Sequence, residues 1–460
     1  MNKIRLTINI VFTFIIYINI ISQEFSWKLA EDIENNIKIP NFPDNEYFIT
    51  DYGAIGDGNY DCSQAIKNAI EVCHNNGGGK VIIPEGIFLT GSIYLKSNVN
   101  LHVLKNAELK FSTQTEKYLP VVLSRWEGVE CMNYSSLIYA NNEKNIAITG
   151  DGILNGQGNN NNWWWWKGLK EYGWNDSLPS QKSSRDKLFK MNDDNIPVEK
   201  RIMGKNEYLR PNFVQFYYCN NILISGVKFK DSPMWFINPV QCKDITISGV
   251  KIEGLGPNND GCNPESCENV LISNCFFNTG DDCIAIKSGR NNDGRRIGIP
   301  SENIVIKNCR MEEGHGGIVM GSEISGGVKN IFVENCEMNS PNLDRAIRIK
   351  TNSVRGGFVE NLYVRNITIG EVKEAVLKIN FYYEEGDNGK HTPLAKNIIL
   401  ENIISQKSDY AIWIKAYERA KVEGLKIIDC KFNNVSYNSI LENVISPFYK
   451  NYFVNCKQVN

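Results

Sequence analysis

A short phrase recurs along most of this chain, and it constrains the fold more than any other feature. Each copy opens with asparagine or aspartate and then alternates apolar with variable residues, many of them β-branched. Alternation with a period of two indicates a strand that buries one face. Successive copies from residue 221 onward lie 23 to 36 residues apart. The copies begin at Asn145, Asn221, Asp244, Asn269, Asn303, Asn330, Asn361 and Asn397.

One such unit is too short to bury its apolar face alone, whereas stacked units bury it against each other. No helical pattern separates the copies, which argues against alternating strands and helices. The repeat therefore predicts an all-β solenoid, a parallel β-helix. Its coils lie about 4.8 Å apart, and equivalent residues form ladders along its axis.

The cysteines fit this interpretation. Several follow an asparagine at equivalent places in the repeat, where a small apolar side chain suits the core. The sequence has no Cys-x-x-Cys, and its four histidines are scattered, so we predict no metal site and no cofactor. We expect most of the 13 cysteines to lie in the core. In an exported chain the odd number leaves at least one thiol free or bonded between molecules.

The first residues suggest a targeting signal. Lys3 and Arg5 precede a short apolar run, which is typical of a secretory signal and too short to cross a bilayer comfortably. An uncleaved anchor is the alternative. We predict a signal peptide over residues 1–22, an extension over 23–45 and a catalytic β-helix over 46–460. The chain is then exported, periplasmic or extracellular, without stable membrane insertion.

Two segments depart from the repeat. Apolar residues at helical spacing between Ser63 and Gly77 predict a short helix that caps the open N-terminal end of the solenoid. Residues 155–210 interrupt the rhythm and predict a long inserted loop of functional importance. The run Trp163–Trp166 in this loop is interpreted either as a sugar-stacking platform or as an exposed hydrophobic anchor.

Charge limits the partners. The 50 basic and 52 acidic side chains give a formal charge of −2, which excludes a bulk polycation for nucleic acid and leaves room for a local basic pocket.

Aligning two consecutive units places several ionisable side chains at neighbouring positions. Asp281 follows Asn269 at the same distance as His315 follows Asn303, so the two side chains occupy one place on adjacent coils. Asp282 lies beside Asp281. By the same register Asp260, Arg348 and Lys350 reach the same outer surface.

Such a surface suits acid–base cleavage of an anionic sugar polymer. One carboxyl group with a raised pKa can protonate the leaving oxygen while another activates water. One or two coil spacings give about the 6.5–9.5 Å that separates the two carboxyl groups of an inverting glycosidase. Arg348 and Lys350 then hold a uronic acid carboxylate. A second basic cluster, interpreted either as a further uronate site or as a solvated loop, consists of Lys287, Arg290, Arg295 and Arg296.

Four segments in the expected order resemble the signature of the polygalacturonases, glycoside hydrolase family 28: Asn258-Asn259-Asp260, Gly280-Asp281-Asp282, Gly314-His315-Gly316 and Arg348-Ile349-Lys350. The opening segment Asp51 to Gly58 is also similar, so the resemblance covers nearly the whole chain after the signal. Asn259 departs from it, because the family usually has threonine there.

The resemblance implies a right-handed, pectin-lyase-like parallel β-helix that hydrolyses α-1,4-galacturonosyl links of pectin with inversion and without a metal. It implies that Asp281 is the general acid and that Asp260 and Asp282 activate water. His315 then supports the acid, while Arg348 and Lys350 bind substrate. Either Tyr382 or Tyr383 corresponds to a tyrosine that the family places near the site.

Several alternatives stay open. The histidine favours a homogalacturonan-type substrate over rhamnogalacturonan, and xylogalacturonan remains a candidate. A calcium-dependent pectate lyase uses the same fold with the aspartates as ligands. A non-catalytic glycan-binding β-helix is the third possibility. The insertion 155–210 and the basic loop 287–296 favour action at chain ends. The oligomeric state does not follow from the sequence.

Overall fold

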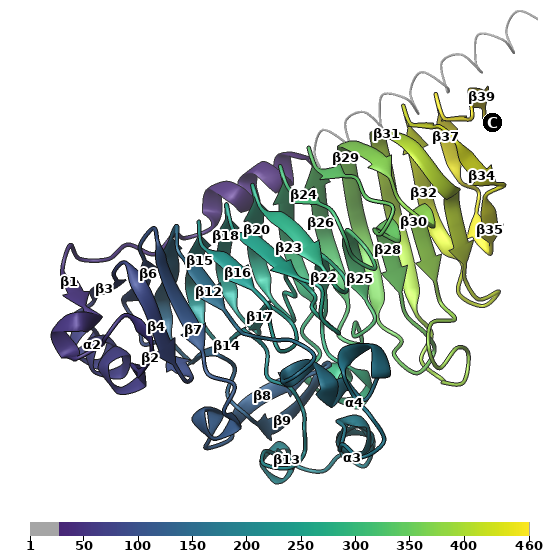
Figure 1. Cartoon of the computed structure of the whole chain (residues 1–460). Coiled ribbons are helices and arrows are strands. Elements are labelled where there is room, and N and C mark those ends of the chain that lie inside the picture. Colours follow the sequence, from purple (N-terminus) through teal and green to yellow (C-terminus); the bar gives the residue numbers. More distant parts are fainter. Residues whose placement is uncertain (1–26, 460) are drawn as a thin grey trace, which may run out of the picture.

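The repeat folds into a long parallel β-helix. The computed structural model describes residues 27–459, so the predicted signal segment 1–22 lies outside the described residues. Each coil contributes up to three strands, and coil follows coil along one axis with the N-terminal and C-terminal ends of the solenoid far apart (Figure 1). The predicted right-handed solenoid is confirmed. Among residues 27–459, no helix has the length and apolar character needed to cross a membrane.

The first strands of successive coils form the longest ladder, here called the first sheet. Every neighbouring pair in it is parallel and in register, as in the row Val270, Ile304, Ile331, Leu362. Its strands are β3 (Gly79–Ile83), β6 (Val99–Val103), β11 (Lys144–Gly150), β15 (Asn220–Ser225), β18 (Lys243–Ser248), β20 (Glu268–Ser273), β23 (Ser301–Lys307), β26 (Val328–Glu334), β29 (Phe358–Glu371), β31 (Leu394–Lys415) and β32 (Val422–Ile428).

A second sheet follows after a sharp bend. Its strands are short, and β29 and β31 run through the bend and so belong to both sheets. The others are β2 (Asp57–Asp61), β4 (Gly86–Thr90), β7 (Ala107–Phe111), β12 (Ile153–Asn155), β16 (Lys228–Lys230), β19 (Lys251–Gly254), β21 (Phe276–Thr279), β24 (Arg310–Met311), β27 (Glu337–Met338), β33 (Lys431–Phe432) and β38 (Phe453–Val454).

The third sheet has the ionisable residues singled out from the sequence on or beside its outer face. Isolated bridges at Cys262 and Glu265 connect its two halves. Its strands are β5 (Ile93–Tyr94), β10 (Ile138–Asn141), β14 (Val214–Tyr217), β17 (Ile237–Val240), β22 (Ile284–Ile286), β25 (Ile318–Gly321), β28 (Arg345–Lys350), β30 (Ala375–Asn380), the end of β31, β34 (Val435–Tyr437) and β35 (Ile440–Glu442).

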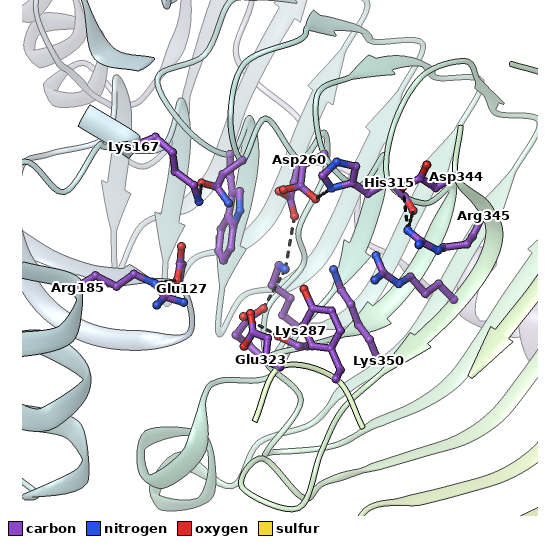
Figure 2. A pocket seen from close by; sticks show the side chains of 17 residues that line it. Glu127, Lys167, Arg185, Asp260, Lys287, His315, Glu323, Asp344, Arg345 and Lys350 are labelled. Carbon is purple, nitrogen blue, oxygen red and sulfur yellow. Dashed lines mark hydrogen bonds and ion pairs between the residues drawn. The ribbon is translucent and has the colours of Figure 1, made fainter. Parts of the chain in front are cut away.

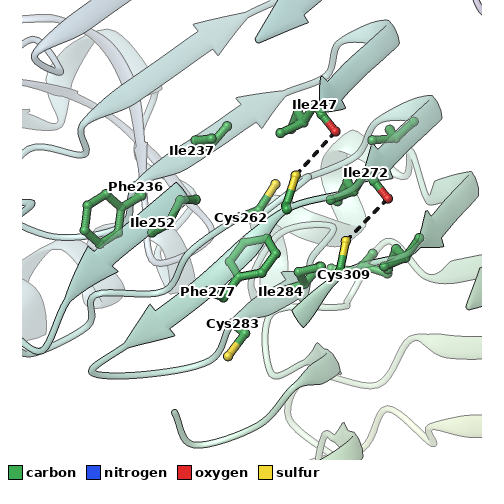
Figure 3. Close-up of a cluster of buried hydrophobic side chains, with 14 of the residues drawn as sticks. Phe236, Ile237, Ile247, Ile252, Cys262, Ile272, Phe277, Cys283, Ile284 and Cys309 are labelled. Carbon is green, nitrogen blue, oxygen red and sulfur yellow. Dashed lines mark hydrogen bonds between the residues drawn. The ribbon is translucent and has the colours of Figure 1, made fainter. Parts of the chain in front are cut away.

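The interior is a continuous column of aliphatic, aromatic and sulfur-bearing side chains. Figure 3 shows Cys262 and Cys283 beside Phe277 and Ile284, all fully buried. Twelve cysteines are buried and Cys456 is exposed, and none of the 13 forms a disulfide within the described residues. The prediction that most cysteines belong to the core is confirmed.

Asparagine side chains bond along the axis at the bend that opens each first-sheet strand. The amide of Asn303 donates to Asn269 at 3.2 Å, and Asn330 donates to Asn303 at 3.0 Å. The ladder continues through Asn361 and Asn397. All of these residues have positive φ near 57°, a conformation that asparagine tolerates better than most side chains. The asparagine that opens each repeat therefore shapes the bend and links the coils.

Two helices pack on the solenoid, one at its N-terminal end and one against its middle coils. The predicted cap is α2 (Ser63–Asn75), which buries Ala65, Ile66, Ala69 and Ile70 against the first coils. The chain then turns through Gly78, where a Cβ would lie 2.4 Å from the carbonyl oxygen of Asn98.

The second helix, residues 27–36, lies in the predicted extension and packs against the outside of the first sheet. Trp27 contacts Phe332 there, at 5.7 Å between ring centroids. The sequence prediction for this segment is only an extension, although its buried residues Trp27, Ala30 and Ile33 recur at helical spacing.

The remaining elements lie at the ends of the molecule or beside the third sheet. At the ends, β1 (Glu46–Phe48) and η1 (Ile49–Tyr52) open the solenoid. The last coil closes with β36 (Val444–Ile445), β37 (Phe448–Lys450) and β39 (Lys457–Gln458). Beside the third sheet lie η2 (Thr115–Tyr118), the hairpin β8 (Val122–Trp126) and β9 (Val129–Asn133), η3 (Trp163–Lys167), η4 (Lys170–Tyr172), α3 (Lys182–Asp193), η5 (Val198–Lys200), β13 (Ile202–Met203) and α4 (Asn291–Ile297).

Candidate active site

A polar cavity of about 360 Å³ opens on the outer face of the third sheet. This volume is within the range of small-molecule sites. Figure 2 shows side chains from the solenoid and from the insertion converging on it. Its lining consists of Glu127, Lys167, Arg185, Trp235, Asn258, Asp260, Asp281, Lys287, His315, Ser322, Glu323, Asp344, Arg345, Arg348, Lys350, Tyr383 and Glu384.

Three carboxylates form the centre of the site. Asp260, Asp281 and Asp282 each place an oxygen within 4.8 Å of the other two. Asp281 has 18% of its side chain exposed, while Asp260 and Asp282 are almost entirely buried. Asp260 lies one coil before the consecutive pair Asp281 and Asp282, so the three side chains meet across a single coil step.

Asn259 holds Asp260 in place. Its amide donates to the carbonyl oxygens of Ser232 and Met234 at 3.0 and 2.8 Å, and its own oxygen accepts from the Gly256 amide at 2.9 Å. All polar atoms of this buried side chain are satisfied. The departure from threonine therefore leaves the turn before Asp260 firmly anchored.

His315 lies directly over Asp281, as the register predicted. Its Nδ1 is 3.0 Å from Asp281 Oδ1, and half of the ring is exposed to the cavity. The hydrogen bond and charge of Asp281 raise the pKa of His315 to about 9. Burial opposes ionisation of Asp281, but the hydrogen bond and charge of His315 outweigh it and lower the pKa of Asp281 below its usual range.

Asp260 behaves in the opposite way. Burial and the neighbouring Asp281 charge raise the pKa of Asp260 to about 8, against the opposing charge of Lys287. The cluster thus keeps one proton near neutral pH, and it is most stable on Asp260 when the cavity is empty of other anions. Because the carboxylates interact strongly, the titration belongs to the group rather than to one residue.

Cations surround the carboxylates. Lys350 Nζ is 2.6 Å from Asp282 Oδ2, and Arg348 is 3.6 Å from the other oxygen of Asp282. Lys287 Nζ is 3.5 Å from Asp260 and 3.0 Å from Glu323. These three cations balance the carboxylates, which makes the trio a poor cage for a divalent ion that needs six or more oxygen ligands.

The predicted second basic cluster separates into two parts. Lys287 lines the cavity, but the three arginines of the cluster do not. Arg290 pairs with Glu323 and Glu385, and Arg296 pairs with Glu130 and Asp293. Arg295 donates to the carbonyl oxygens of residues 354 and 355 at 3.0 Å. These guanidinium groups hold α4 and the neighbouring loops together rather than facing the cavity.

The structure also separates the two tyrosines. Tyr383 lines the cavity, with Arg348 and Lys350 each 5.4 Å from its ring centroid. Tyr382 is 47% exposed and lies outside the cavity against Tyr417. Tyr383 is therefore the one of the pair placed at the site.

The β8–β9 hairpin and the insertion together form one wall of the cavity. Glu127 comes from the turn between β8 and β9, Lys167 from the end of η3, and Arg185 from α3. Arg185 pairs with Glu127 at 2.8 Å. The sequence locates the insertion but not these residues, because nothing in the repeat fixes where an insertion folds back.

The tryptophan run has neither of the two predicted roles. Trp163 and Trp166 are buried and pack with Tyr118, Tyr134 and Tyr208. They anchor the insertion inside the hydrophobic core rather than on a surface. The tryptophan that does reach the cavity is Trp235, with Lys287 Nζ 4.5 Å from its ring centroid. No pattern in the sequence assigns Trp235 this position.

Comparisons with known proteins agree with this geometry. A "probable polygalacturonase" of Vitis vinifera is 29% identical over 392 residues, which cover 82% of this chain and 70% of the relative. An "exo-poly-alpha-D-galacturonosidase" of Dickeya chrysanthemi is 26% identical and covers 85% of this chain and 71% of the relative. The crystal structure of an exopolygalacturonase from Thermotoga maritima is 44% identical, with a TM-score of 0.89 and coverage of 92% of this chain and 96% of that one.

The family comparison covers the part of the chain that carries the site. The model of glycosyl hydrolases family 28 matches residues 198–450, which include every one of the three carboxylates, His315, Arg348 and Lys350. The chain therefore belongs to glycosyl hydrolases family 28 and is a glycoside hydrolase.

Proposed function

We propose that this enzyme removes galacturonate from the ends of pectin chains by hydrolysing α-1,4-galacturonosyl links with inversion. One observation carries the proposal. The cavity combines three carboxylates with cations that can bind a uronate, and the insertion borders it on one side. The similarity to the exopolygalacturonase of Thermotoga maritima supports it.

In the proposed mechanism Asp281 protonates the glycosidic oxygen. It is the most exposed of the three carboxyl groups and has His315 against it. Asp260 and Asp282 lie deeper and activate the water that attacks the anomeric carbon. Arg348 and Lys350, beside Tyr383, hold the carboxylate of the sugar on the leaving side.

Bound substrate reconciles the role of Asp281 as the acid with the pKa values of the carboxyl groups in the absence of substrate. Without substrate, the pKa of Asp260 is raised to about 8 and that of Asp281 is lowered. A uronate carboxylate bound beside the trio adds negative charge, which raises the pKa of its carboxyl neighbours and keeps the proton in the cluster. Where the uronate raises the pKa of Asp281 above that of Asp260, the proton passes from Asp260 to Asp281, which arms the acid and frees Asp260 to act as a base.

Two features favour action at chain ends. Glu127, Lys167 and Arg185 line the cavity on the side of the β8–β9 hairpin and the insertion, where we infer that they close it. A polymer cannot pass through such a wall, so only a terminal sugar fits beyond the scissile bond. The anionic character of the substrate is matched by the cations Lys287, Arg348 and Lys350.

The proposal is tested by sizing products from polygalacturonate over time. We expect a single short product from the first minutes, while the polymer shortens slowly. Early release of a ladder of oligomers would contradict chain-end action. Proton NMR of the first product distinguishes inversion, which yields the β-anomer, from retention.

The same digestion separates the rivals. A lyase requires its metal and leaves an unsaturated sugar, so activity that survives chelator and gives saturated products excludes it. A non-catalytic β-helix binds oligogalacturonate without releasing any sugar. Wild-type protein that binds but releases nothing would end the proposal.

The location of the enzyme follows from its substrate. Pectin is too large to enter a cell intact, and residues 1–22 have the pattern of a secretory signal. We propose export to the periplasm or the exterior. Determining the first residue of the protein recovered outside the cytoplasm tests this.

A further inference from the structure

The outer face of the third sheet continues beyond the cavity toward the C-terminal end of the solenoid. Arg348 on β28 is in register with Lys378 on β30, which is in register with Trp413 on β31. In the parallel row, Lys350 is followed by Asn380 and then by Lys415. In-register parallel strands place these side chains one above another along the axis.

Alternation confirms which way they face. The residues between them, including Ile347, Leu377 and Ile412, are buried in the core. Because successive side chains on a strand point to opposite faces, Lys378 and Trp413 share the outer face with Arg348, which lines the cavity. Two coil steps, about 10 Å, therefore separate the cavity residue Arg348 from Trp413.

The four residues of this outer track, Lys378, Asn380, Trp413 and Lys415, combine cations with an aromatic ring. Lys378 Nζ lies 4.4 Å and Lys415 Nζ 5.5 Å from the centroid of the Trp413 ring. An indole face suits the apolar face of a sugar ring, and ammonium groups suit its carboxylate. A galacturonate chain presents both.

Of the two lysines on the track, Lys415 is the one that can change its partner. Lys378 is held by Glu374 and is 12% exposed. Lys415 is 36% exposed and pairs with Glu442, itself 52% exposed, at 3.1 Å. An ion pair this open to water is worth little, so Lys415 can exchange Glu442 for a uronate carboxylate at small cost.

We propose that the outer track binds the galacturonate units that follow the scissile bond. The proposal rests on the proposed function. The insertion walls the cavity on its other side, so the unreacted length of the polymer leaves along the track. Trp413 and Lys415 then make the enzyme prefer long chains over short ones.

The test compares two substrates: hexagalacturonate and the shortest galacturonate oligomer that the wild type cleaves. The measured quantity is the ratio of kcat/KM for the long substrate to kcat/KM for the short one. We expect Trp413→Ala and Lys415→Gln each to lower this ratio by about threefold to tenfold, tenfold being the effect of a 1.4 kcal/mol loss. Lys415→Gln alters only a partly exposed side chain, so it keeps the test valid if Trp413→Ala folds poorly.

The control is Lys396→Gln. Lys396 is an exposed lysine on the same strand, but in the first sheet, and we expect it to leave the ratio unchanged. An unchanged ratio in Lys415→Gln, or equal losses on both substrates, overturns the track. Failure of the wild type to cleave either oligomer instead refutes the proposed function, so the two failures are distinguishable.

Discussion

Asp281 differs from the other two carboxylates in what it can reach. It lies at the surface of the cavity under His315, whereas Asp260 and Asp282 are buried behind it and are held by lysines. A group that delivers a proton to substrate has to be within hydrogen-bond reach of it. At the scale of single residues, exposure and partner therefore assign the roles within a trio of chemically identical groups.

Replacing this acid tests the assignment. We expect Asp281→Asn to lower kcat by about 10²- to 10⁴-fold, the usual contribution of a general acid, because the amide has no proton of suitable pKa to give. Affinity for oligogalacturonate and the thermal unfolding midpoint should change little, as measured by calorimetry. The control is Asp176→Asn, at an exposed carboxylate outside the cavity lining. Near-normal turnover of Asp281→Asn would refute its role.

Lys287 sets the pH range of the site. Its ammonium lies 3.5 Å from Asp260 and lowers the pKa of that carboxyl group, which nevertheless remains raised to about 8. The enzyme needs the cluster's proton, so kcat/KM of the wild type should fall as pH rises through about 8. In Lys287→Met the opposing charge is gone, the pKa of Asp260 rises, and the alkaline limb of the profile should move to higher pH.

Lys287→Arg provides the matched control, since it keeps the charge and should keep the limb near its wild-type position. A full pH profile of kcat/KM for the three proteins makes the comparison. A lysine with a merely structural role would lower activity at every pH without moving the limb. A limb that stays in place, or moves down, would show that Lys287 does not tune Asp260.

At the scale of elements, α3 is the piece that brings the insertion to the cavity. Leu188 is fully buried between this helix and the β8–β9 hairpin, beside Trp126 and Met203. Arg185, one turn earlier on the same helix, reaches the cavity wall. The wall therefore depends on a small hydrophobic cluster that is separate from the solenoid core.

Loosening that cluster should relax chain-end action. Leu188→Ala removes a buried side chain at a cost of about 2–5 kcal/mol, borne locally by α3. We expect a higher KM and the appearance of longer oligomers among the first products of polygalacturonate digestion, measured by chromatography. Leu169→Ala, at an exposed leucine of the same insertion, is the control. A strictly short product from Leu188→Ala would show that α3 does not close the cavity.

Some helices and strands could be predicted from the sequence and others could not. The strands and α2 follow from local periodicity, because a residue's face in a strand or helix depends only on its neighbours in sequence. The hairpin, α3 and the walls they form do not follow. Their placement depends on contacts such as the burial of Trp163 and Trp166, which a sequence pattern cannot distinguish from surface aromatics.

At the scale of the whole molecule, the site exists because successive coils stack in register. Once one coil lies on the next, Asp281 and His315 become neighbours although 34 residues separate them. This is why the repeat alone predicts that the carboxylates, His315 and the Arg348–Lys350 pair meet on one surface. Register does not fix the path of insertions, and so it does not place Arg185 or Arg290.

The asparagine ladder tests how coils hold together. Asn303 donates one hydrogen bond and accepts another, at a φ of 58°. Asn303→Gly keeps the backbone conformation and loses both hydrogen bonds, about 2 kcal/mol in all. Asn303→Ala adds about 1–2 kcal/mol for the left-handed conformation. We expect thermal unfolding midpoints in the order wild type, Gly, Ala, measured by calorimetry. Equal midpoints for the three proteins would show that the ladder does not stabilise the stack.

The buried, unpaired cysteines free the enzyme from redox conditions. Burial raises the pKa of the Cys283 thiol to about 12, so it stays protonated and unreactive, and eleven further cysteines are buried as well. None of the cysteines among residues 27–459 is cross-linked, so a reductant has no disulfide to break within this part of the chain. The core can therefore form in an oxidising or a reducing compartment.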